Sequence, residues 1–133
     1  LNIFAPVVLM AFIIKNLLTS TFAMIATMVY SALNKKSRLK EIDVEEHKKE
    51  VDVKQVIEKI DQLKDQLFLV TNNKQYDAIM AEIDYLKEKK SKHENDAIGL
   101  LEEKEVLKET VESMESELET LSNDLQKRRE KTR

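Results

Sequence analysis

The sequence predicts an all-α fold, a long antiparallel two-helix coiled-coil hairpin preceded by an apolar helix. The 133 residues include one Gly and one Pro, and 35% of them are charged, which is typical of long helices rather than of a domain with many turns. Leucine, isoleucine and valine recur at alternating steps of three and four residues over much of the chain, as in a coiled coil. Residues 1–33 differ from the rest because Lys15 is their only charged residue.

Residues 1–33 are predicted to form an apolar helix that spans a membrane. About 20 apolar residues are enough to cross a bilayer, and "LLTSTFAMIATMVYSAL", at 17–33, already gives 17 uncharged residues. The basic stretch "NKKSRLK" follows directly. By the positive-inside rule, the C-terminal end of the span is therefore expected on the cytoplasmic side. Lys15 either snorkels or marks the end of a span that starts at Leu17.

Other interpretations of residues 1–33 stay open. A signal peptide is disfavoured, because no basic residue precedes the apolar run and no convincing small-residue cleavage site follows it. A buried core helix would need more apolar surface than the rest of the chain offers. Residues 1–33 could also come from a misread or misassembled start of the reading frame, so that they do not precede the hairpin in the native protein. Because the chain starts with Leu, we expect it to be a fragment of a longer reading frame.

Residues 34–133 are predicted to form the hairpin, with a first helix over about 35–70. Upstream in this helix, Glu46 and Lys49 break the apolar phase, so the seam is expected to be weaker there. From residue 53 onwards the steps alternate regularly between three and four. The residues that define this seam are Val53, Val56, Ile60, Leu63, Leu67 and Val70.

The polar segment "TNNKQ", at 71–75, is predicted to be the hairpin turn. The heptad phase moves by two residues across it, whereas a continuous coiled coil accommodates insertions of three or four. Asparagines tolerate turn conformations, and about five residues is a usual length for joining antiparallel helices. Folding the chain there places Ile60 against Leu86 and Leu63 against Ile83, so that an a position meets a d position each time.

The second helix is predicted over about 75–130. Lys90, His93 and Lys104 are polar residues at seam positions, of the kind that fixes register in coiled coils. Charge pairs four residues apart, such as Glu88 and Lys92, support the helix on its exposed faces. Its apolar seam residues are Ile79, Ile83, Leu86, Leu100, Leu107, Val111, Leu118, Leu121 and Leu125.

No pattern in the chain indicates catalysis or metal binding. There is no Cys, no HExxH and no glycine-rich phosphate loop. Of the two histidines, His47 is expected on a solvated face and His93 in the seam. Residues 34–133 carry a net charge of −4 with both signs mixed, so nucleic-acid binding is not expected. We expect a protein that is not an enzyme, with no catalytic or metal-binding residue and no cofactor in this chain.

The segment "VTNNKQYDAIMAEIDYLKEKKSKHENDAIGLLEE" resembles the tip motif of a bacterial family of coiled-coil hairpin proteins that carry a C-terminal four-cysteine zinc ribbon, with members in chlamydiae and in flagellated bacteria. The family pattern reads roughly V-x-(S/T)-N-(K/R)-E-Y-x-A-(L/I)-x-x-E-I, and the resemblance covers about 40–133. Asn73 and Gln75 depart slightly from this pattern, the latter from a usual Glu. The residues of the expected hairpin-tip motif are Val70, Thr71, Asn72, Asn73, Lys74, Tyr76, Asp77, Ala78 and Glu82.

The resemblance implies a scaffold that binds other proteins through the coiled coil, in transcription-factor handling or in secretion and flagellar assembly. Zinc is expected only in a ribbon downstream of this chain. A homo-oligomer is a further expectation. The hairpin is expected in the cytoplasm, either tethered to the inner face of the membrane through residues 1–33 or free. The corresponding alternative function is a membrane-anchored coiled-coil spacer.

Overall fold

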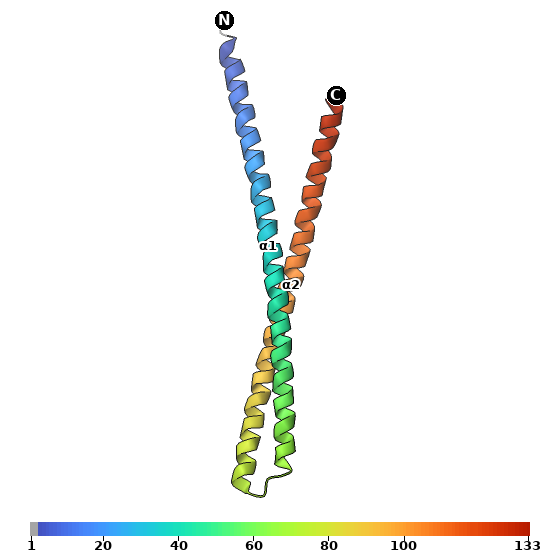
Figure 1. Ribbon diagram of the computed structural model, residues 1–133. Coiled ribbons are helices and arrows are strands. Elements are labelled where there is room, and N and C mark those ends of the chain that lie inside the picture. Colours follow the sequence, from blue (N-terminus) through green and yellow to red (C-terminus); the bar gives the residue numbers. More distant parts are fainter. Residues whose placement is uncertain (1–2) are drawn as a thin grey trace. The chain divides into compact units, whose positions relative to one another are not determined.

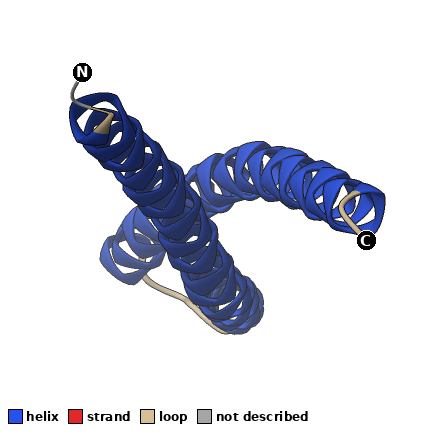
Figure 2. Cartoon of the chain, turned by 90° about the horizontal axis from the view of Figure 1, so that it is seen from above, coloured by secondary structure: helices blue, strands red, loops and turns tan. Residues whose placement is uncertain are grey.

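The computed structural model describes residues 3–133, which form two long helices and no strand. Helix α1 spans Phe4–Leu67 and helix α2 spans Asn73–Lys131, joined by a short connection (Figure 1). Figure 2 shows the same chain from above, with loop drawn only at the connection and at the chain ends. The predicted all-α hairpin of two packed helices is confirmed. Residues 1 and 2 of the predicted span lie outside the described residues.

Helix α1 is continuous from the apolar stretch into the charged one. The sequence suggested an apolar helix over 1–33 and a separate helix from about residue 35, but α1 passes through this boundary without a break. The reason is local, because "SALNKKSRLKE" contains no Gly or Pro to end a helix. Pro6, the one proline of the chain, lies in the first turn of α1, where a missing backbone N–H is tolerated.

The connection between the helices covers 68–72, three residues earlier than the predicted 71–75. The end of α1 is tightened by two short-range bonds, in which the backbone N–H groups of Phe68 and Leu69 donate to Asp65 and Gln66. Asn72 then starts α2, because its Oδ1 accepts a 2.9 Å hydrogen bond from the backbone N–H of Lys74. Asn72 therefore caps the second helix, and the chain reverses just before it.

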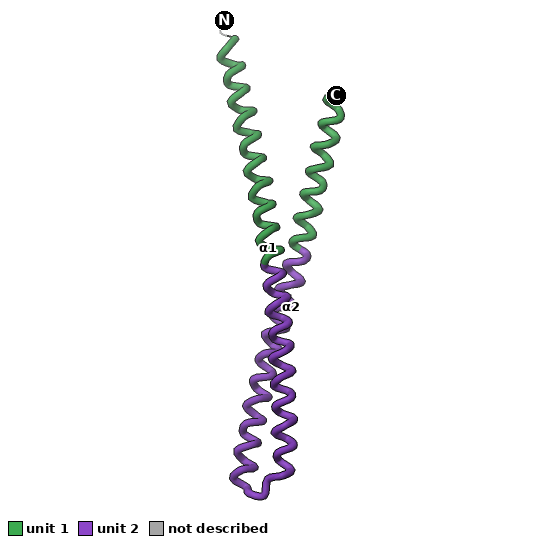
Figure 3. The backbone as a smooth tube through the Cα atoms, viewed as in Figure 1, with its two compact units in different colours: residues 1–37, 110–133 green, residues 38–109 purple. Residues whose placement is uncertain are grey.

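The chain divides into two compact units, which are drawn in different colours in Figure 3. One unit comprises residues 38–109 and contains the connection. The other comprises residues 1–37 and 110–133, in which Ala32 and Val111 are buried and Lys36 forms an ion pair with Glu115.

Candidate functional site

The end of the hairpin nearest the connection is held by an apolar core. Each of its five central side chains is less than 9% exposed, and Ile83 is the most buried of them at 2%. Leu67, Ile79 and Met80 pack against this cluster. All these residues except Met80 belong to the predicted seam, so the alternating steps of three and four bring them to one face of each helix. The five central residues are Val56, Ile60, Leu63, Ile83 and Leu86.

Further from the connection, the seam of the same unit becomes polar. Lys104, at a seam position of α2, is held between two acidic side chains of α1. Its Nζ lies 2.7 Å from Asp43 Oδ1 and 2.8 Å from Glu46 Oε2. Hydrogen bonds to Asp43 and Glu46 raise the pKa of Lys104 above its ordinary value. A cation with two anions at this level links the two helices through charge rather than through apolar packing.

A second polar layer lies between Lys104 and the apolar core. The Nζ of Lys49 donates a 3.0 Å hydrogen bond to Asp96 Oδ2 and lies 3.4 Å from Nδ1 of His93. Lys49 and His93 are both half-buried. The hydrogen bond from Lys49 lowers the pKa of Asp96. In this layer too, a charged side chain of α1 pairs with a side chain of opposite charge on α2.

A third group of charges is centred on Arg38, which contacts both helices. Its guanidinium donates to Glu103 at 2.9 Å through Nε and at 3.1 Å through an Nη, a bidentate arrangement that favours one geometry. Nη1 also lies 3.2 Å from Glu41 and 3.4 Å from Glu45. The hydrogen bond from Arg38 lowers the pKa of Glu103, and the pKa of Arg38 itself is raised by its bonds to Glu103 and Glu41.

The connection exposes a group of apolar side chains to solvent. Phe68 is 88% exposed and Leu69 is 81% exposed, although both directly follow the last helical residue of α1. Tyr76, in the first turns of α2, is 48% exposed. Large aromatic side chains are enriched in the central contacts of protein interfaces. The hairpin tip, defined as residues 68–76, therefore exposes three large apolar side chains close to the apolar core.

The structure places the predicted tip-motif residues at the connection without bringing their polar side chains together. Val70 is half-buried and lies in the connection rather than in α1. Asn72 caps α2, and Glu82 Oε1 lies 3.5 Å from Lys59 Nζ on the opposite helix. The remaining motif side chains are exposed: Thr71, Asn73, Lys74, Tyr76, Asp77 and Ala78.

Outside the apolar core, the predicted seam residues fall into three groups, which are exposed, buried and half-buried. Leu121 is 39% exposed and Leu125 is 59% exposed, so the structure leaves both uncovered. Val111 is buried. The others are half-buried: Val53, Leu100, Leu107 and Leu118.

Sequence reasoning missed the ion pairs of Glu46 and Lys49 and the exposed Phe68 and Leu69. Glu46 and Lys49 interrupt the apolar phase of the seam, yet both are half-buried and paired across the helices. A signal was present, since Glu46 occupies a seam position on one helix and Lys104 occupies one of opposite charge on the other. Two adjacent large apolar residues between the seam positions Leu67 and Val70 could likewise have indicated the tip.

The described residues offer no arrangement for metal chemistry. Within 3–133 no three His, Asp or Glu side chains lie close enough together to hold a metal ion. His93 contacts a lysine, and the carboxylates of the seam are engaged with cations. What this geometry provides is a register-specific seam and an exposed tip.

A comparison with known protein families finds a match over most of the chain. The family described as the CT398-like coiled coil hairpin domain matches residues 19–133. The chain belongs to this family. The match begins inside the apolar stretch, and so extends further upstream than the expected range of about 40–133. No curated protein and no solved structure matches the chain.

Proposed function

We propose that this CT398-like hairpin is a non-enzymatic module that binds other proteins through its tip. The observation that carries the proposal is the exposure of Phe68 and Leu69 at the end of a well-packed pair of helices. Exposed apolar side chains grouped at one place are characteristic of interaction sites. Ile60, Leu63 and Ile83 hold the two helices together immediately behind them, so the tip is presented without a need for large rearrangement.

The wider context of the proposal follows from the family resemblance at the tip motif. We place the hairpin in a longer bacterial protein in which a four-cysteine zinc ribbon follows it. Its partners would be proteins of transcription-factor handling or of secretion and flagellar assembly. The mixed charges of the helical faces, including Arg38 and Glu103, would tune which partner approaches and how fast.

In-cell photocrosslinking tests the tip. A photoreactive phenylalanine analogue at Phe68 should form adducts with an identified protein, whereas the same analogue at Val44, which is 70% exposed on α1, should not. Purified partner should then bind the Phe68→Ser/Leu69→Ser variant at least about tenfold more weakly than wild type, because central apolar contacts dominate binding energy. A role for the tip would be contradicted if wild type and the Phe68→Ser/Leu69→Ser variant bound the partner equally and adducts were as frequent at position 44 as at position 68.

A second candidate is a membrane-anchored coiled-coil spacer, favoured by the surface of α1. The helix includes a stretch apolar enough to cross a membrane, and none of that stretch is buried by the rest of the chain. Upstream of Ile25, the first half-buried residue of α1, every described side chain is exposed. Helical residues 4–24 would extend about 32 Å at 1.5 Å per residue, and the hydrocarbon core of a bilayer is about 30 Å thick.

Membrane extraction separates the anchored protein from a wholly cytoplasmic one. We expect the chain to stay with membranes through an alkaline carbonate wash, because a spanning helix is not released by breaking ionic contacts. Replacing Leu9, Ile13 and Leu17 with Gln should release it, since each polar side chain would have to enter the hydrocarbon. Release of the unmodified chain as a soluble homo-oligomer would instead show that residues 3–24 are covered by protein.

A further inference from the structure

The last part of α2 keeps the seam pattern but has no apolar cover. Leu118 is half-buried, whereas Leu121 and Leu125 are 39% and 59% exposed. These three residues continue the alternating steps of three and four, so they lie along one side of the helix. A narrow row of leucines on a charged helix requires a partner surface that accepts aliphatic side chains.

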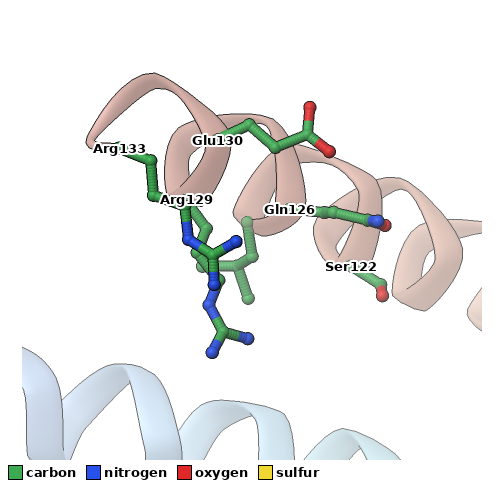
Figure 4. A pocket seen from close by; sticks show the side chains of 6 residues that line it. Ser122, Gln126, Arg129, Glu130 and Arg133 are labelled. Carbon is green, nitrogen blue, oxygen red and sulfur yellow. The ribbon is translucent and has the colours of Figure 1, made fainter.

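The row of leucines continues into arginines. Positions four apart share a face of a helix, so Arg129 and Arg133 extend the row that contains Leu125. Figure 4 shows the side chains of Arg129 and Arg133 on one side of α2, with Glu130 directed away from them. Together with Ser122 and Gln126, these residues line an open hollow on α2.

The end of α2 is also strongly basic. Residues 127–133 contain five cationic side chains and one acidic one, Glu130. Among the described residues 3–133, none of these five cations forms an ion pair within 4 Å. The five are Lys127, Arg128, Arg129, Lys131 and Arg133. An anionic partner surface would complement them.

The unit that holds both ends of the chain determines where this segment would lie. Lys36 of α1 pairs with Glu115 of α2, and the helices run in opposite directions, so residues after Glu115 are level with residues before Lys36. If the apolar residues 3–24 cross a bilayer, the basic end of α2 falls at the same level as the hydrocarbon. A cluster of five arginines and lysines is strongly excluded from that region, whereas a single lysine such as Lys15 can snorkel towards the membrane–water boundary. The segment must therefore leave α1 and stay at the membrane–water boundary.

We propose that residues 118–133 of α2 lie on an anionic lipid surface, with Leu121 and Leu125 inserted at the level of the headgroups. Arg129 and Arg133 would contact lipid phosphates from the same side, and the neighbouring cations would add attraction to the cytoplasmic leaflet. This inference deepens the membrane-anchored candidate function. Nucleic acid also offers phosphates, but it provides no surface for a row of leucines.

A tryptophan reporter tests the proposal in the full chain, which contains no other Trp. The Leu125→Trp variant is reconstituted into vesicles of phosphatidylcholine alone and into vesicles with roughly 30% phosphatidylglycerol, which imitate a neutral and an anionic leaflet. We expect a blue-shifted emission that brominated lipid quenches only in the anionic vesicles, and that high salt reverses. The matched control is Asn123→Trp, which lies off the leucine row and should remain in water.

Charge variants identify the residues that bind the surface. In the Leu125→Trp background, Arg129→Gln/Arg133→Gln should lower the ratio of surface-bound to free segment about thirtyfold, because each cation near an anionic surface contributes roughly a factor of five. Lys87→Gln/Lys92→Gln removes the same charge from an exposed part of α2 and should leave the ratio unchanged. Circular dichroism verifies that both variants keep their helix.

The two vesicle types separate this inference from the anchor. Flotation with phosphatidylcholine vesicles reports the span of α1, whereas the emission of the tryptophan reports the α2 segment. A chain that floats but shows no response to phosphatidylglycerol overturns the α2 proposal and leaves the anchor in place. A chain that responds without floating on neutral vesicles supports the α2 surface and contradicts the anchor. Blue-shifted emission before vesicles are added would mean that protein covers Leu125, which also overturns the α2 proposal.

Discussion

At the scale of single residues, the apolar core near the tip depends on a few side chains that meet across the seam. Ile83 is 2% exposed and belongs to the same cluster as Ile60 and Leu63. Val44 and Tyr85, by contrast, are also large and mainly apolar but lie on outer faces at 70% and 64% exposure. Burial here follows heptad position rather than side-chain type, because only the a and d positions of each helix face the other.

Ile83→Asp should destabilise the hairpin by about 3–5 kcal/mol, since the carboxylate would enter an apolar cluster without a partner. Urea unfolding followed by circular dichroism measures the loss of free energy. The control is Tyr85→Asp on the outer face of α2, which should change stability by no more than about 0.5 kcal/mol. Equal midpoints for Ile83→Asp and wild type would show that the apolar cluster does not hold the helices together.

Asn72→Ala should lower the free energy of unfolding by about 1 kcal/mol, the usual cost of losing an N-cap side chain. The physical reason is that the backbone N–H of Lys74 would lose the 2.9 Å bond to Asn72 Oδ1. Asn72→Ser should restore most of the loss, because a hydroxyl also accepts this bond. If the Ala and Ser variants unfold at the same urea concentration, Asn72 does not act as a cap.

At the scale of the helices, the seam alternates in character along its length. Close to the connection it is apolar, and between Arg38 and Lys49 it is crossed by ion pairs to Glu103, Lys104 and Asp96. Polar seam positions lower stability but penalise other registers, which would leave charges unpaired. The apolar core thus provides cohesion, and the charged layers specify which residues of α1 face which residues of α2.

Lys104→Met should destabilise the hairpin by about 1–2 kcal/mol, because Glu46 would remain half-buried without its cation. The double variant Lys104→Met/Glu46→Leu should recover this loss, since apolar replacements of a buried pair are often neutral or stabilising. Thermal melts of the wild type, both single variants and the double variant measure the coupling. Strictly additive effects would mean that Lys104 and Glu46 do not interact in solution.

Acid should weaken the charged layers. The pKa values of Asp96 and Glu103 are lowered by hydrogen bonds from Lys49 and Arg38, so the folded state binds protons less readily than the unfolded chain. Their stabilisation is therefore fully present above the unfolded carboxylate values, which lie at about 4, and is lost as the pH falls below them. Melting temperatures measured at successively lower pH should decline below about pH 4. The decline should be smaller in the Asp96→Asn/Glu103→Gln variant.

The sequence predicts which side chains of the two helices form the apolar core, but not where the helices end. The steps of three and four identify Ile60, Leu63 and Ile83 as facing residues, because periodicity alone determines the side of a helix on which a residue lies. The connection was placed three residues late, since the cap made by Asn72 depends on local hydrogen bonds that periodicity does not contain. The exposure of Leu121 and Leu125 could not be predicted either, because the seam pattern does not reveal where the partner surface stops.

At the scale of the whole molecule, the reversal of the chain can be tested directly by a disulfide between the helices. Ile60→Cys/Leu86→Cys places thiols at two positions of the apolar core that the heptad register pairs across the helices. In a continuous helix these positions would be roughly 39 Å apart at 1.5 Å per residue, far beyond the Cα separation of about 7 Å that a disulfide allows. At low protein concentration, mild oxidation should therefore yield an intramolecular bond, seen as a faster band on a non-reducing gel.

Ile60→Cys/Tyr85→Cys moves one thiol to the outer face of α2 and should not cross-link. Intermolecular dimers of the Ile60→Cys/Leu86→Cys variant would instead indicate that two chains associate along the full length of their seams, and the exposed Phe68 and Leu69 would then not form a tip.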